Sequence, residues 1–257
     1  MATHQQEGGK RLICKMKFDS LPDSLKRGYS ERSFRVNVPH LHIHRKPSMG
    51  FLIASMPLGC NLMGWRGSGG DGAAIIGLFF FFGGMLQVLG SILEWIIGGN
   101  TFPFVVFACY SAFWLAMGVT LQPAFNAQAY YAAQAGGTSQ FYSSFSFFWM
   151  VMALVTFFFL VASVRTNIVF VLVFFFIDLA FIMLMATYWT LAEGKTAIAG
   201  KCQKAAGAFI FVFCVFGWYL FLPMILLAVD FPLRLPTGDL SVILKGASER
   251  KRAEPKA

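Results

Sequence analysis

The fold is decided by residues 167–191, which read NIVFVLVFFFIDLAFIMLMATYWTL. Asp178 is the one charged residue in this stretch. A helix rises 1.5 Å per residue, so about 20 apolar residues cross the ~30 Å hydrocarbon layer of a bilayer. Apolar side chains would surround this helix on every face, a surface that water disfavours and lipid accepts. The stretch therefore predicts a helix that spans a membrane.

The rest of the chain has the same character. Of the 257 residues, 57% are hydrophobic and 13% are charged, whereas a water-soluble domain usually carries about 25% charged residues. Five further apolar stretches are found at residues 47–64, 73–97, 100–122, 143–164 and 206–229. We therefore predict an all-α membrane protein with six transmembrane helices, and we exclude a disordered chain and a disulfide scaffold.

The charges divide the chain into three parts: a basic arm at residues 1–46, a transmembrane domain at 47–230 and a basic tail at 231–257. With six spans, the arm, the tail and Arg165 place 17 of the 21 Lys and Arg residues on one side of the membrane. The positive-inside rule then predicts that both termini are cytoplasmic. The net charge of +9 would face anionic membrane lipids rather than a nucleic acid.

The connectors are short, and we expect polar or Gly-rich loops at residues 65–72, 122–140 and 193–204. A helix start is expected at residues 100–103, because Asn100 can cap a helix and Pro103 is tolerated in its first turn.

The distribution of reactive side chains argues against an enzyme. All four histidines lie in the arm, the five cysteines show no CxxC spacing, and no GxSxG or P-loop motif stands before a helix. His40, His42 and His44 alternate and could share a face for a metal ion, but we interpret them as a segment leading to the first span. We predict no enzyme activity, no cofactor and no metal site.

Two acidic residues lie within apolar stretches, where an ionised group costs at least about 2.5 kcal/mol. Glu94, near the end of residues 73–97, is either a carboxylate that reaches the headgroups or a pore-mouth group that accepts a proton. Asp178 would be protonated or hydrogen-bonded between helices. Both readings of each residue remain open on the sequence alone.

The helix start expected at residues 100–103 favours the binding of a small anion. A helix that begins at Asn100 and Thr101 would present N–H donors and partial positive charge. No Lys or Arg lies inside a span, which disfavours a di- or triphosphate. A monocarboxylate could pass with the help of Asn100, Tyr110 and Ser111, or as the neutral acid.

Several motifs carry a family resemblance. They are Gly83-Gly84-Met85-Leu86-Gln87, Leu93-Glu94-Trp95, Gly99-Asn100-Thr101-Phe102, Ala112-Phe113-Trp114-Leu115 and Leu235-Pro236-Thr237-Gly238-Asp239. In these residues the chain resembles the acetate uptake transporter family, which includes bacterial succinate–acetate permeases and fungal acetate transporters. The family signature N-P-A-P-L-G-L would fall on residues 45–51, where Gly50 is identical.

The resemblance implies a six-helix protomer, a hexameric ring and a pathway through each protomer. Family members carry acetate and in some cases succinate, and both proton-coupled and channel-like transport are described for them. Their constriction consists of a Phe, a Tyr and a Leu. The Tyr matches Tyr110, the Leu falls on Phe174, and the Phe falls near Ala54, with Phe51 one turn earlier.

Our leading hypothesis is a multi-pass plasma-membrane transporter for acetate-like monocarboxylates, working as a proton symporter or as a channel. Tyr110 and Phe174 would line a narrow neck, Asn100 and Thr101 would offer donors at one mouth, and Glu94 would exchange a proton. The first alternative is a membrane sensor or scaffold that does not transport. The second is export of ammonium or ammonia with the help of Glu94 and Asp178.

Overall fold

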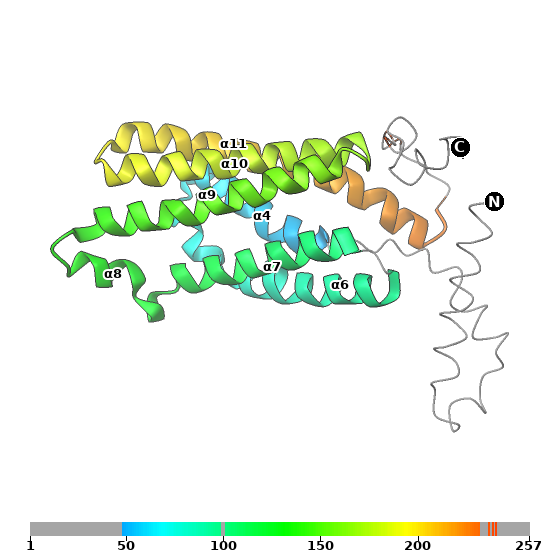
Figure 1. The fold of residues 1–257 in the computed structure, drawn as a ribbon, viewed down its shortest axis with the longest axis horizontal. Coiled ribbons are helices and arrows are strands. Elements are labelled where there is room, and N and C mark those ends of the chain that lie inside the picture. Colours follow the sequence, from blue (N-terminus) through cyan, green and yellow to red (C-terminus); the bar gives the residue numbers. More distant parts are fainter. Residues whose placement is uncertain (1–47, 99–100, 232–235, 237, 239, 241–257) are drawn as a thin grey trace, which may run out of the picture. The chain divides into compact units, whose positions relative to one another are not determined.

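The structure is a computed structural model that describes residues 48–98, 101–231, 236, 238 and 240, and its regular elements are helices (Figure 1). In chain order the longer elements are α4 (Ser48–Leu62), the π-helix η3 (Phe79–Leu86), α6 (Gln87–Leu93), α7 (Thr101–Leu121), α9 (Gly137–Ser163), α10 (Ile168–Ala192) and α11 (Thr196–Ala228). The shorter ones are η1 (Trp65–Gly67), η2 (Gly70–Ile75), α5 (Ile76–Leu78), η4 (Glu94–Gly98), η5 (Pro123–Phe125) and α8 (Ala127–Ala132).

Among the described residues, five helical segments are long and apolar enough to cross a membrane: Gly70–Ile96, Thr101–Leu121, Gly137–Ser163, Ile168–Ala192 and Thr196–Leu226. They coincide with five of the six predicted stretches. The first stretch forms α4, whose 15 residues rise only about 22 Å. Gly64, with φ 74°, turns the chain shortly after α4 ends. The chain is a multi-pass membrane protein.

Two predicted boundaries were wrong. The helix expected from residue 206 begins at Thr196, so most of the loop predicted at 193–204 is helical. Its polar residues do not interrupt the helix because Lys201 and Lys204 are exposed, while Gln203 donates a hydrogen bond to Asp71 over 2.5 Å. In the loop predicted at 122–140, the short helix α8 forms and α9 already begins at Gly137.

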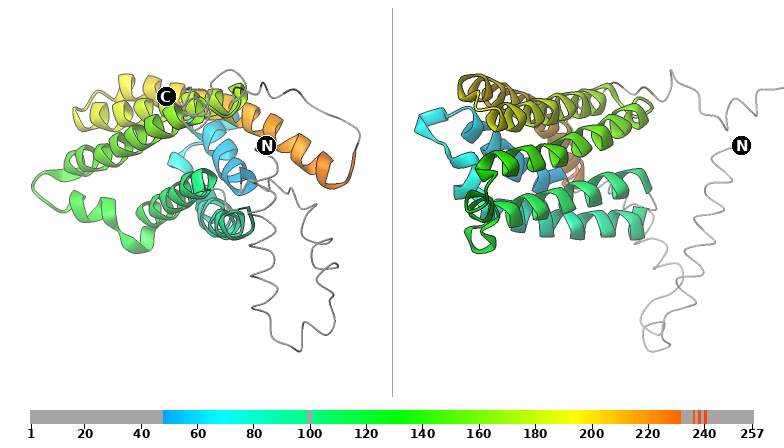
Figure 2. Two further views of the ribbon diagram at one scale, coloured as in Figure 1. Left: turned by 45° about the vertical axis from the view of Figure 1, so that its right-hand side comes forward. Right: turned by 60° about the vertical axis from the view of Figure 1, so that its left-hand side comes forward.

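The helices pack in two groups with α4 between them. Helix α10 contacts both α9 and α11, and α7 contacts η3 and α6. Helix α4 (blue) touches α11 on one side and η3 on the other, and Figure 2 shows it between the two groups. This arrangement brings α4, α7, α10 and α11 around a shared apolar core.

Close helix contacts depend on small residues. A Cβ atom at Gly83 would lie 2.4 Å from Cγ of Trp114, and one at Gly207 would lie 2.8 Å from the carbonyl oxygen of Gly59. Glycine therefore lets η3 approach α7 and lets α11 approach α4, as is usual for helix pairs in membranes.

After α11 the chain returns to the turn between α9 and α10. The Tyr219 hydroxyl donates to the carbonyl of Pro236 over 2.7 Å. Ile168 N–H donates to the carbonyl of Gly238 over 2.9 Å, and Leu240 N–H donates to the carbonyl of Thr166 over 3.0 Å. The segment around Gly238 thus pairs with the start of α10.

Candidate functional site

Two small cavities lie in the core to which α4, α7, α9, α10 and α11 contribute. Cavity 1 has a volume of about 20 Å³ and cavity 2 a volume of about 40 Å³, each enough for at least one water-sized molecule. Cavity 1 is lined by residues that include Ser55, Leu58, Trp114, Trp149, Leu184 and Ile210. Cavity 2 is lined by residues that include Val106, Tyr110, Phe174, Gly217, Leu220 and Met224.

The cavities follow one another along the helices. On α7, cavity 2 is lined by residues 106–110 and cavity 1 by residues 113 and 114; on α10, the residues are 170–177 and 177–184. Phe51 and Ile177 of α10 line both cavities, while Phe213 lines cavity 1 and Tyr110 lines cavity 2. We call these four residues the neck.

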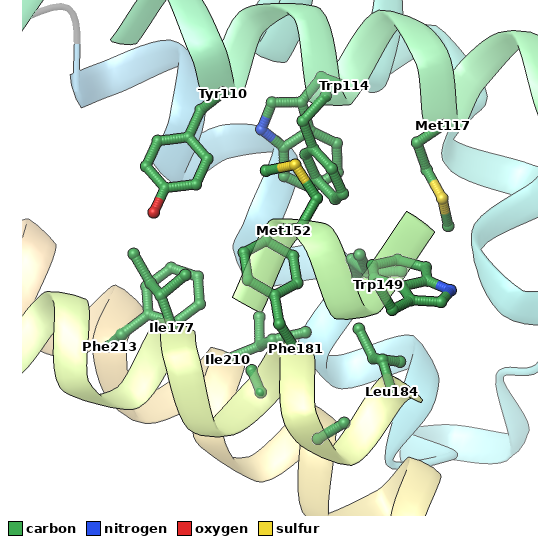
Figure 3. Close-up of a cluster of buried hydrophobic side chains, with 14 of the residues drawn as sticks. Tyr110, Trp114, Met117, Trp149, Met152, Ile177, Phe181, Leu184, Ile210 and Phe213 are labelled. Carbon is green, nitrogen blue, oxygen red and sulfur yellow. The ribbon is translucent and has the colours of Figure 1, made fainter. Parts of the chain in front are cut away.

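Aromatic contacts close the neck. The ring centroid of Phe51 lies 5.1 Å from that of Tyr110 and 5.5 Å from that of Phe213. Figure 3 shows Tyr110 reaching from α7 toward Ile177 on α10, with Phe213 beside it. The neck consists of aromatic and aliphatic side chains, with the Tyr110 hydroxyl as its polar group. Such a constriction disfavours a hydrated ion.

Three of the predicted pathway residues come together here. Tyr110 and Phe174 are each 1% exposed, and their stacked rings lie 6.5 Å apart between centroids. Phe51, Tyr110 and Phe174 all line cavity 2. Ala54 is fully buried but lines neither of the two cavities, and neither does Ser111, whose hydroxyl donates to the carbonyl of Phe107 over 2.7 Å.

The remaining predicted residues are not among those that line the two cavities. Glu94 is 5% exposed and begins the π-helical turn η4, and Thr101 is exposed at the start of α7. Asn100 lies outside the described residues, as do the arm histidines. Asp178 follows Ile177 on α10, and its Oδ1 atom is buried without a hydrogen-bond partner among the described residues. Glu94, Thr101 and Asp178 line neither cavity.

Thr156 of α9 is a residue that the sequence analysis missed. Its Oγ1 atom lies 3.0 Å from the hydroxyl of Tyr110, and either oxygen can be the donor. Both side chains are buried, with Thr156 fully so. The only signal in the sequence is a threonine inside the apolar stretch 143–164, which does not indicate a partner 46 residues away.

A polar stripe on the second span was also missed. Gln87, Ser91 and Glu94 are buried and spaced by four and three residues, so they share one face of the helix. The Ser91 hydroxyl donates to the carbonyl of Val88, whereas neither amide atom of Gln87 has a hydrogen-bond partner among the described residues. Polar residues at helical spacing in residues 73–97 could have revealed this stripe.

The described part of the chain contains no group of three His, Cys, Asp or Glu residues placed to hold a metal ion. Cys60, Cys109, Cys202 and Cys214 are free thiols. The residues that line the two cavities offer hydroxyls, aromatic rings and aliphatic side chains, and none of them carries a charge.

Comparison with known proteins agrees with this architecture. Residues 48–241 match the model of the GPR1/FUN34/yaaH family. Protein alcS of Aspergillus fumigatus is 43% identical over 198 residues, which cover 75% of this chain and 72% of alcS. Acetate permease A of Emericella nidulans is 34% identical over 139 residues, which cover 54% of this chain and 46% of the permease.

The solved structure of the bacterial acetate channel SatP has the same fold. It matches with a TM-score of 0.58 and 23% sequence identity, and the match covers 75% of this chain and 96% of SatP. The family match spans all the described helices. This chain is a member of the GPR1/FUN34/yaaH family.

Proposed function

We propose that this protein transports acetate-like small monocarboxylates across the plasma membrane, through the neck of each protomer. The observation that carries the proposal is the neck itself, an aromatic constriction between two small cavities along the bundle. Relatives named acetate permease A and acetate transporter protein patA, and a structural neighbour named an acetate channel, support the same class of substrate.

The chemistry of the neck favours a weak acid. An ionised carboxylate loses its hydration in an apolar constriction, whereas the neutral acid escapes most of that cost. Transport together with a proton, as symport or as movement of the neutral acid, fits this neck. Glu94, with Asn100 and Thr101 near it in sequence, would act at the mouth rather than in the neck, because neither Glu94 nor Thr101 lines cavity 1 or cavity 2. We extend the proposal to succinate only as a secondary substrate.

The proposed topology has six spans, with α4 as the short one, and cytoplasmic termini as the charge distribution predicts. We further propose a hexameric ring. Large apolar side chains are exposed along one side of η3 and α6, among them Phe81, Met85, Leu89 and Leu93. Such a surface suits lipid or a second protomer, and native mass spectrometry in nanodiscs would count the protomers.

The test is uptake of labelled acetate into proteoliposomes that contain the full chain. We expect uptake above that of empty vesicles, and faster uptake when the outside is more acidic. Uptake equal to that of empty vesicles at every pH gradient would sink the proposal and favour the sensor or scaffold alternative.

A pair of isoleucine variants tests the route. Ile177→Phe adds bulk at a side chain that lines both cavities, so we expect uptake to fall. Ile198→Phe makes the same change at a side chain that is 50% exposed on α11, and it should leave uptake unchanged. Equal uptake by the two variants would mean that the solute does not pass the neck.

The lining of the two cavities does not support the alternative of ammonium export. Glu94 and Asp178, the acidic groups within the described spans that this alternative needs, line neither cavity. Replacing both residues and measuring ammonium efflux would test it directly.

A further inference from the structure

Among the described residues, Tyr110 has one hydrogen-bond partner and several aromatic neighbours. Its ring packs against the rings of Phe51, Phe159 and Phe174, with centroids 5.1, 5.9 and 6.5 Å away. Its hydroxyl meets the Thr156 hydroxyl, and the two oxygen atoms are 3.0 Å apart. The ring therefore has apolar neighbours on several sides, and in the described part of the chain the hydroxyl has one directional contact.

That anchor lies outside the pathway. Tyr110 lines cavity 2 and touches Phe51, which lines both cavities, whereas Thr156 on α9 lines neither. The hydroxyl pair thus ties α7 to α9, while the ring of Tyr110 contributes to the neck. A buried hydroxyl without a partner is unfavourable, so the bond favours the position in which Tyr110 crosses the neck.

We propose that Thr156 is a positioning residue that anchors Tyr110 across the neck, so that the passage of a solute requires the Tyr110–Thr156 bond to break. The inference rests on the proposed transport function. By fixing the ring, the bond sets the width of the neck and disfavours acids bulkier than acetate.

The principal variant is Thr156→Val, which keeps the shape of the side chain and removes the hydroxyl. In proteoliposomes with the full chain, we expect acetate uptake to rise about 2- to 13-fold, the range that corresponds to one net hydrogen bond. Uptake of butyrate should rise by a larger factor than uptake of acetate. Thr156→Ser retains a hydroxyl and should behave like the parent protein.

Thr187 on α10 provides a matched control. It is 3% exposed, and its hydroxyl donates to the carbonyl of Met183 on the same helix over 2.7 Å. Thr187→Val removes a buried hydroxyl without affecting the neck, so uptake and the butyrate-to-acetate ratio should not change.

A double-mutant cycle with Tyr110→Phe separates an anchor from a general packing effect. Tyr110→Phe alone should raise uptake as Thr156→Val does, and Thr156→Val should add nothing in the Tyr110→Phe background. Additive effects, or a Thr156→Val variant with unchanged or lower uptake, would overturn the inference. If Thr156→Val does not yield a monodisperse protein, Tyr110→Phe serves as the test. Acetate uptake by Tyr110→Phe that does not exceed that of the parent protein then rejects the proposed anchor.

The two proposals fail in different ways. If the parent protein shows no uptake above that of empty vesicles, both the proposed transport function and the proposed anchor are rejected. If the parent protein transports acetate, and Thr156→Val has the same rate and the same butyrate-to-acetate ratio, only the proposed anchor is rejected.

Discussion

Replacing Gly83 by alanine tests the close contact between η3 and α7. The added Cβ would lie 2.4 Å from Cγ and 2.9 Å from Cβ of Trp114. These atoms lie at the base of the Trp114 side chain and cannot turn aside as the tip of a flexible side chain would. Trp114 is 2% exposed, and its ring lies 4.8 Å from that of Phe79 between centroids, so the ring itself has little room to move.

The expected loss in the free energy of unfolding follows from a comparison with the control variant Gly77→Ala. Overpacking of a core costs about 1–3 kcal/mol, while alanine gains about 1 kcal/mol over glycine in a helix. Gly77 is exposed, and a Cβ there would meet nothing within 4 Å. Gly77→Ala therefore has the gain in helix propensity without the cost of overpacking. The two variants should therefore differ in the free energy of unfolding by about 1–3 kcal/mol, with Gly83→Ala the less stable.

Thermal unfolding of the purified variants in one detergent is a suitable assay. At about 2–4 °C per kcal/mol for a chain of this size, the Tm of Gly83→Ala should lie about 2–12 °C below that of Gly77→Ala. Equal Tm values would refute the reasoning, because they would mean that η3 and α7 are not in the contact that the structure shows.

Two further predictions concern single side chains. Phe174→Leu shortens a ring that is 1% exposed and lines cavity 2, so uptake of butyrate relative to acetate should rise in proteoliposomes; an unchanged ratio would place Phe174 outside the pathway. Gln87→Met keeps the length of a fully buried side chain and removes two amide atoms that lack partners among the described residues, so the free energy of unfolding should rise by about 1–3 kcal/mol. A fall measured by denaturation in detergent would show that this amide has a partner in the assembled protein.

The sequence predicted the spans because lipid imposes a strong condition on composition. Any stretch such as residues 167–191 must bury its backbone polar groups in a helix and present apolar side chains to lipid. The early start of α11 at Thr196 was missed because Lys201 and Lys204 interrupt the apolar pattern but not the helix. Charged residues near a span end can remain helical while they face the headgroups.

The site was only partly predictable. Tyr110, Phe174 and Phe51 were expected from the family resemblance, and the structure places all three at cavity 2. The bond between Tyr110 and Thr156 depends on how two helices are rotated toward each other. Because both helices are apolar on every face, the periodicity of their sequences does not fix that rotation. The orientation of the termini, the hexamer, the proton and the three-part domain division stay predictions.

The return of the chain onto α10 changes how shortened versions of this protein should be interpreted. Ending the polypeptide before Pro236 would delete the acceptor for Ile168 N–H, at the start of α10, and the donor for the carbonyl of Thr166, in the turn just before it. A loss of activity in such a truncated protein would then report a frayed helix end beside the pathway, and not the removal of a regulatory tail. Cutting after Leu240 preserves both pairings and isolates whatever the basic residues beyond it contribute.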